Sequence, residues 1–123
     1  MRLLMRPTQD AVAAVREAVA VDGGAHGVAV FSAELPVFSG HFPGAPLVPG
    51  VYVLAAIAEV ARRAGVARGD ICSVERAKWT APAYPDQALR ITLTVRAVDG
   101  GWRVDGEVSG PSAVCATARL LLA

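Results

Sequence analysis

The feature that most constrains this sequence is an apolar stretch that begins at Pro49-Gly50 and carries no charge until Glu59. Proline suits the first turn of a helix, and residues 51–58 continue without a helix breaker. With Gly65 as the stop, the pattern predicts a helix over residues 50–64. Because this helix is apolar on all sides for two turns, it has to be surrounded by protein.

The residues after this helix indicate strands joined by tight turns. These segments are rich in Val, Ile, Leu and Thr, residues that favour a pleated, half-buried surface. The turns between them are APAYPDQ, DGG and GPS, and Asp99-Gly100-Gly101 is typical of a hairpin. The four predicted strands cover residues 71–79, 88–98, 101–109 and 112–122.

A hairpin is predicted before the helix, around Asp22-Gly23-Gly24. Its second strand is expected within residues 27–36, and its first within 15–21, although over 11–21 the alanines favour a helix and the valines a strand. Two strands, one helix and four strands predict a single α+β domain over residues 1–123, with an antiparallel sheet wrapped around one central helix.

Composition and charge exclude several classes of function. The chain of 123 residues is 54% hydrophobic and 19% charged, and its 12 basic and 11 acidic residues give a net charge of +1. Neither nucleic acid nor a membrane is expected as a partner. Prolines interrupt the longest uncharged stretch, residues 35–58, and the amino-terminal apolar run is short, so we expect a cytoplasmic protein. Two histidines with Cys72 and Cys115, predicted to be buried free thiols, make no metal site.

His41 stands out as a candidate functional residue. It lies in a loop stiffened by Pro43, Pro46 and Pro49, shortly before the predicted helix. A structural histidine that is satisfied by a backbone carbonyl is the plain alternative. The rigidity of the loop favours a site, because catalysis needs preorganised groups.

The segment GHFPGAPLVPGV, residues 40–51, resembles the signature of the hot-dog-fold 3-hydroxyacyl-ACP dehydratases of the FabA/FabZ type. The segment AKWTAPAYPDQAL, residues 77–89, and the predicted strand order fit the same family. The resemblance implies a hot-dog fold and the conversion of a 3-hydroxyacyl thioester, carried on acyl carrier protein, to the trans-2-enoyl thioester in fatty-acid or polyketide/polyene biosynthesis. No cofactor is implied beyond the phosphopantetheine arm of the carrier.

The resemblance also assigns roles to residues. His41 matches the base that removes the proton alpha to the thioester, and the backbone N–H of Gly50 matches the oxyanion donor. Further residues around the motif and the helix start are expected to bind substrate: Phe42, Val51, Leu54 and Ala55. Trp79 and Tyr84 are interpreted as packing groups of the core or rim rather than as recognition groups.

The sequence departs from the family at position 55, where Ala55 replaces the carboxylate that protonates the departing hydroxyl. Glu59 lies one helical turn later on the same face and is a candidate for a displaced acid. The alternative is that Glu59 forms ion pairs with Arg62 and Arg63. A carboxylate from a partner chain is a third source of the acid.

Partners follow from the same resemblance. Arg62, Arg63 and Arg68 are candidates for docking an acidic acyl carrier protein, or they form a solvated cluster. The family pairs its subunits, so a homodimer or a heterodimer with a dehydratase-like subunit is expected. Because of Ala55, the alternative function is a catalytically reduced subunit that binds the acyl chain beside an active partner. An acyl thioesterase fits the motif less well.

Overall fold

The computed structural model describes residues 5–38 and 46–123 of the chain. Within these residues, six strands form one sheet in the order β1-β2-β4-β5-β6-β3, and every neighbouring pair is antiparallel. The predicted α+β hot-dog architecture is therefore confirmed. The elements are α1 (Pro7–Ala14), β1 (Val15–Val21), β2 (Gly24–Ala29), the 3-10 turn η1 (Pro36–Phe38), α2 (Gly50–Arg63), β3 (Ile71–Trp79), β4 (Leu89–Val98), β5 (Gly101–Ser109) and β6 (Val114–Leu122).

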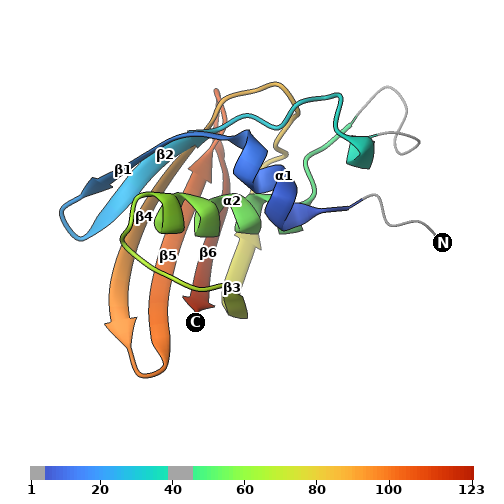
Figure 1. The fold of residues 1–123 in the computed structure, drawn as a ribbon. Coiled ribbons are helices and arrows are strands. Elements are labelled where there is room, and N and C mark those ends of the chain that lie inside the picture. Colours follow the sequence, from blue (N-terminus) through green and yellow to red (C-terminus); the bar gives the residue numbers. More distant parts are fainter. Residues whose placement is uncertain (1–4, 39–45) are drawn as a thin grey trace.

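Helix α2 lies across the concave face of the sheet, with α1 packed against its other side (Figure 1). Every residue from Tyr52 to Ala61 is buried, as the all-apolar pattern requires. The helix ends where predicted, because Gly65 adopts a φ of +77° just after the cap residue Ala64. The core between helix and sheet consists largely of small and β-branched side chains, which let α2 approach the strands closely.

In residues 11–21 the sequence pattern did not decide between helix and strand. The structure is helical up to Ala14 and forms a strand from Val15. Strand β1 is confirmed with its predicted bounds, whereas α1 was not predicted. The prediction of a strand over 27–36 is wrong in its bounds, because β2 covers Gly24–Ala29. Beyond Ala29 the backbone leaves the sheet: Val30 N–H donates to Ala14 O and Phe31 O accepts from Asp86 N–H.

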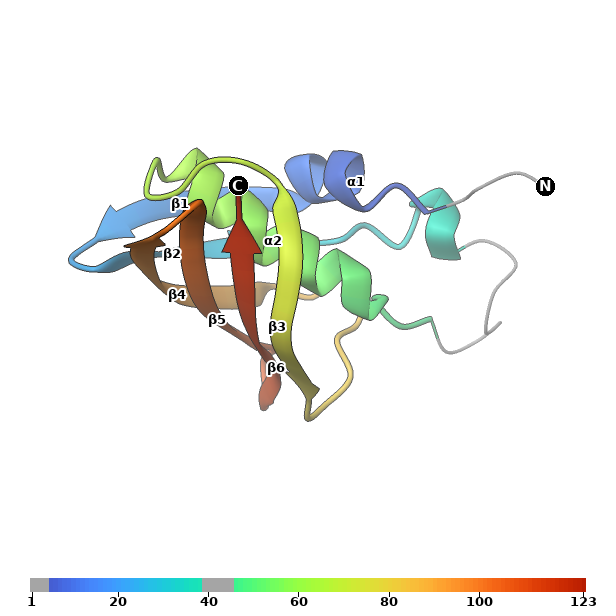
Figure 2. The same cartoon turned by 90° about the horizontal axis from the view of Figure 1, so that it is seen from below.

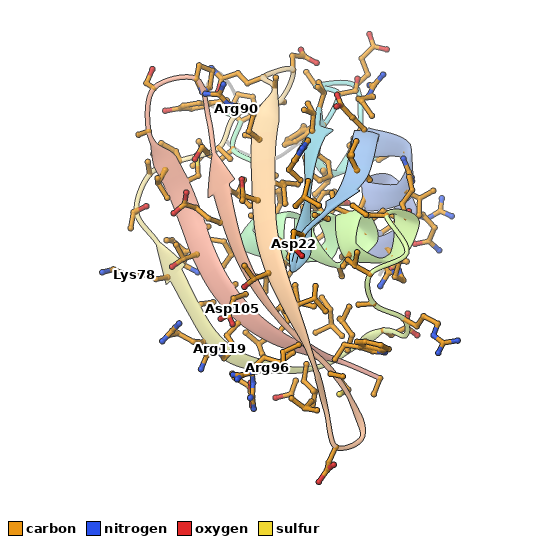
Figure 3. All side chains as sticks on the ribbon, turned by 90° about the vertical axis from the view of Figure 1, so that its left-hand side faces the viewer. Asp22, Lys78, Arg90, Arg96, Asp105 and Arg119 are labelled. Atoms are coloured by element: carbon orange, nitrogen blue, oxygen red, sulfur yellow. The ribbon has the colours of Figure 1, made fainter. Side chains whose placement is uncertain are left out.

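The outer face of the sheet is polar and charged, since alternate residues of β4, β5 and β6 point away from α2. Figure 3 shows Arg96, Asp105 and Arg119 on this face. The Arg119 Nε donates to Asp105 Oδ1 at 2.8 Å, and this bond raises the pKa of the Arg119 guanidinium. The face therefore tolerates water and needs no cover.

Strand β3 is the edge of the sheet that runs beside α2 (Figure 2). All its residues after Ile71 are exposed, including Val74 and Trp79. Val74 pairs in register with the buried Leu120, and Trp79 with the buried Ala116. Both large apolar side chains therefore sit at positions that are buried on the neighbouring strand, yet they are about half exposed on the edge.

No helix in residues 5–38 or 46–123 is long and apolar enough to cross a membrane. Among these residues the two cysteines are unpaired. Cys115 is buried as expected, but the prediction that Cys72 is buried is wrong, because it lies on the exposed edge strand β3.

Candidate functional site

The amino terminus of α2 is held in place by the loop between β3 and β4. Val48 N–H donates to Ala83 O at 2.8 Å, and Pro49 then occupies the cap position with extended backbone. No side chain caps the helix in this part of the structure. The first N–H groups of a helix have no intrahelical acceptor, so Gly50 starts α2 with donors that can bind a ligand oxygen.

A pocket of about 440 Å³ opens at this helix terminus. Its volume lies in the range of small-molecule sites, and no charged side chain is among its lining residues. The lining comes from the segment before α2, the first turns of α2, the end of β3 with the β3–β4 loop, and the start of β6. Its residues are largely apolar: Leu47, Val48, Gly50, Val51, Val53, Leu54, Trp79, Ala81, Pro82, Ala83, Cys115 and Ala116.

Trp79 packs directly on Gly50. A Cβ atom added to Gly50 would meet the indole Cζ2 at 2.8 Å, closer than side chains tolerate. Only glycine therefore lets the indole lie against the backbone at the start of α2. The ring is half exposed and lines the pocket, which agrees with the interpretation of Trp79 as a rim residue rather than a core residue.

The residues predicted from the motif and from the start of the helix fall into three groups. His41 and Phe42 lie outside the described residues, so their positions stay predictions. Gly50, Val51 and Leu54 come together in the apolar pocket. Ala55 is buried beside them on α2 but does not line that pocket.

Ala55 lines a second, smaller hollow of about 300 Å³. This hollow lies between α1, the middle of α2 and the start of β3. In contrast to the first pocket, its lining includes two charged residues, Arg62 and Asp70. The full lining consists of Thr8, Ala55, Ala58, Arg62, Asp70 and Ile71. The helix position at which the family carries its carboxylate thus faces a hollow rather than a packed wall.

Glu59 lies in neither cavity. Its Oε1 is 3.2 Å from Arg62 Nη2 and its Oε2 is 3.0 Å from Arg63 Nη2, so both carboxylate oxygens are paired. The Glu59 side chain is only 11% exposed. The expected ion pairs are therefore present, and they are partly buried.

The two arginines also make backbone contacts. Arg62 Nη1 donates to Gly69 O at 3.0 Å, and Arg63 donates to the carbonyl oxygens of Val12 and Val15. Glu59 thus orients two cations that join the end of α2 to α1, β1 and the loop before β3. Arg68 is exposed and makes no ion pair with a described residue.

A buried tyrosine fixes α1 on α2. Tyr52 is fully buried, and its hydroxyl donates to Asp10 Oδ2 at 2.5 Å while it accepts from Arg6 N–H at 3.0 Å. Burial, together with the hydrogen bond to Asp10, raises the pKa of Tyr52 to about 12. The phenol therefore stays neutral and serves as a structural bridge.

Sequence reasoning missed Asp70. It lies 15 positions after Ala55, and only the turn after α2 brings the two to one hollow. The available signal was Gly65 and Gly69, which bracket a tight return of the chain. Among the described residues no three His, Cys, Asp or Glu side chains form a metal-binding group.

Comparisons with known proteins show the family and the fold of this chain. Residues 22–114 match the family model described as ApeI-like, ApeI dehydratase. The 3-hydroxyacyl-acyl-carrier-protein dehydratase FabZ of Geotalea uraniireducens is 34% identical over 82 residues, which cover 58% of this chain and 57% of the relative. FabZ of Thiobacillus denitrificans is 32% identical over 99 residues, covering 70% and 67%. The chain thus spans from 57% to 67% of the length of these two relatives.

Among solved structures, the dehydratase heterocomplex ApeI:P from Xenorhabdus doucetiae superposes with a TM-score of 0.70. The match covers 96% of this chain and 98% of that chain at 19% identity. At this identity the likeness is evidence for a shared fold alone.

Proposed function

This chain belongs to the ApeI-like dehydratase family, and we propose that it dehydrates a 3-hydroxyacyl thioester to the trans-2-enoyl thioester. The observation that carries the proposal is the uncapped start of α2 at Gly50, which opens into an apolar pocket of about 440 Å³. An acyl thioester needs both features: a donor for its carbonyl oxygen and an apolar space for its chain.

The polar part of the site acts on the thioester carbonyl. Negative charge develops on that oxygen when the proton at C2 is removed, and the N–H of Gly50 together with the helix dipole stabilises it. The base in this proposal is His41, which follows from its motif rather than from its position. Phe42, from the same motif, belongs to the proposed substrate-binding residues. The reaction needs no resident cofactor.

The apolar part of the site selects the chain. Val51 and Leu54 offer no hydrogen-bonding side chain to a polar substituent, and Trp79 has only its indole N–H. We propose that the acyl chain lies along these three side chains and that the thioester end is placed at Gly50. Acyl length and type follow from the space that Trp79 leaves, because its ring is the largest group at the mouth.

Glu59 is a poor general acid in this arrangement. Both of its oxygens are held by arginines, and it lines neither cavity. The same contacts argue against Arg62 and Arg63 as carrier-docking groups, since each is engaged with Glu59 and with backbone carbonyls. Of the three arginines, Arg68 alone is left as a proposed contact for an acidic carrier protein.

A second candidate function rests on Ala55 and on the edge strand β3. Here the chain is a reduced subunit that binds the acyl chain while a dehydratase-like partner supplies the acid. The half-exposed Val74 and Trp79 on an unpaired strand edge support association with a second chain. The similarity to a chain from a dehydratase heterocomplex is compatible with an unlike partner.

One experiment separates the two candidates. The purified chain is offered a 3-hydroxyacyl-pantetheine thioester, alone and with the proteins that copurify from its native source, and enoyl product is measured by its absorbance. Product from the chain alone, lost in His41→Ala, supports the dehydratase. Product only with the copurified partner supports the reduced subunit, and no product in either case contradicts both.

A further inference from the structure

Among the residues that line the hollow beside Ala55, Asp70 is the one with a carboxyl group, and it is exposed to solvent. The two alanines on its helix wall, Ala55 and Ala58, have only a methyl group each, so the space that a longer side chain would fill stays open. Asp70 is the last residue of the loop that returns from α2 to β3, and the path of that loop beside α2 is seen in Figure 2.

The hollow and the apolar pocket are neighbours along α2. Leu54 lines the pocket and the adjacent Ala55 lines the hollow. From Gly50 to Ala55 the helix rises by roughly 7.5 Å, at about 1.5 Å per residue. In the family that the motif resembles, the acid at the position of Ala55 acts on the C3 hydroxyl, so we expect a substrate bound at Gly50 to extend its C3 substituent toward the hollow that Ala55 lines.

The backbone of Asp70 is fixed. Its N–H donates to Ala123 O and its carbonyl accepts from Ala123 N–H, each at 3.0 Å. The preceding Gly69 has a φ of +94° and packs so closely on Ala123 that a Cβ atom would overlap its carbonyl carbon. The carboxyl group thus extends from a constrained backbone, as a catalytic group requires.

The Asp70 side chain makes no hydrogen bond or ion pair with any described residue. The cation in the same hollow, Arg62, already contacts Glu59 and Gly69 O. Two other carboxyl groups contact α2, but Asp10 is held by the Tyr52 hydroxyl and Glu59 by two arginines, whereas Asp70 is free to contact a ligand.

We propose that Asp70 is a catalytic residue that supplies the acid missing at position 55; this inference rests on the proposed dehydratase function. The base removes the proton from C2, and the electron pair of that bond forms the C2–C3 double bond. The C3–O bond breaks, and the Asp70 carboxylic acid protonates the leaving oxygen, directly or through one water molecule. The departing group is water, and the carboxylate recovers its proton from the protonated base, so the only products are enoyl thioester and water.

The test compares Asp70→Asn with Asp22→Asn, a matched change in the exposed turn between β1 and β2 (Figure 3). On a 3-hydroxyacyl-pantetheine thioester, Asp70→Asn is expected to lower kcat by about 10²- to 10⁴-fold, while Asp22→Asn keeps the wild-type rate. Exchange of the C2 proton of a saturated acyl-pantetheine thioester with deuterium from solvent needs only the base, so Asp70→Asn should retain it.

A rescue variant keeps the test independent of folding damage. Adding Ala55→Glu to Asp70→Asn places a carboxyl group in the same hollow from the helix side and should restore dehydration. Wild-type turnover by Asp70→Asn, or loss of proton exchange along with dehydration, overturns the role of Asp70 and leaves the dehydratase standing. A wild-type protein that forms no enoyl product contradicts the dehydratase itself, and the role of Asp70 with it.

Discussion

At the scale of single residues, the contact between Gly50 and Trp79 determines the shape of the site. Gly50→Ala adds a Cβ atom that would lie 2.8 Å from the indole, so the half-exposed ring has to swing outward. We expect turnover to fall on the order of 10- to 100-fold, because small displacements in an active site are costly. The unfolding temperature should change little, because alanine is the better helix former by about 0.5–1 kcal/mol and offsets the strain.

The matched control is Gly50→Ala combined with Trp79→Phe, whose smaller ring leaves room for the methyl group. Turnover in the double variant should exceed that of Gly50→Ala, measured as kcat/KM on the same thioester. An undiminished rate in Gly50→Ala alone would mean that the indole does not shape the site.

Glu59 gives a second prediction at this scale. Glu59→Gln removes both ion pairs to Arg62 and Arg63 and should lower the free energy of unfolding by roughly 1–2 kcal/mol, since these partly buried bonds involve charged groups. Turnover per folded molecule should stay near that of the wild type. Urea unfolding and kcat, measured on one preparation, separate the two effects, and a collapse of kcat in a stable protein would identify Glu59 as the acid.

Single residues also show how far the sequence alone reaches. The position of Gly50 at the start of α2 could be predicted because its motif is local, whereas its role as oxyanion donor stays a prediction. The pairs of Glu59 could be predicted because residues three and four apart on a helix are neighbours. Asp70 could not, since its proximity to Ala55 depends on the path of the loop between α2 and β3. Helical periodicity holds no information about such contacts.

At the scale of elements, the docking of α1 on α2 depends on Tyr52 and can be followed by pH. The pKa of Tyr52 is raised from 10.0 to about 12, so the folded state favours the neutral phenol. The resulting stabilisation of the folded state is fully present below pH 10 and is lost as the pH rises through about 12, because the tyrosine of the unfolded chain ionises first. The stabilisation at stake is roughly 2–3 kcal/mol.

We therefore expect the free energy of unfolding to fall more steeply between pH 10 and 12 in the wild type than in Tyr52→Phe. At neutral pH the variant should be less stable by about 1 kcal/mol, because Asp10 and the Arg6 N–H lose their partner. Urea titrations across this range provide the measurement, with the exposed Tyr84→Phe as control. Parallel curves for wild type and Tyr52→Phe would contradict the bridge.

The elements differ in how well the sequence predicts them. Strands β3 and β5 have their predicted bounds because glycine and proline turns delimit them. Strand β6 begins at Val114, later than predicted, because Gly110 N–H donates to Ala113 O and extends the turn. Helix α1 was missed because its stability comes from tertiary contacts: Ala11 and Ala14 are buried, and Asp10 bonds Tyr52. A short helix has little intrinsic stability in water.

At the scale of the whole molecule, the many apolar residues of the chain are divided between the core and the surface. Most are buried between α2 and the sheet. Others are exposed, and four of these lie at the start of α2 and on the edge strand β3: Leu47, Val51, Val74 and Trp79. The remaining exposed large apolar residues are spread over other elements: Met5, Val12, Val19, Val21, Tyr84 and Val114. Each cavity is lined by one end of β3, through Trp79 in one and Ile71 in the other, so we expect a second chain paired with β3 to lie against both.

This arrangement predicts that a charge on β3 separates the subunits. Val74→Lys places an ammonium group at the centre of the proposed interface, and burying it without a partner costs enough to weaken association by at least about tenfold. Val19→Lys is the matched control, because Val19 is similarly exposed on β1, the other edge of the sheet. Sedimentation should give the mass of a dimer for the wild type and for Val19→Lys, and a smaller mass for Val74→Lys. The turnover of Val74→Lys should fall in parallel, because its cavities lose the cover of the second chain. The reverse result, dissociation by Val19→Lys alone, would place the interface on β1 and leave the cavities open to solvent.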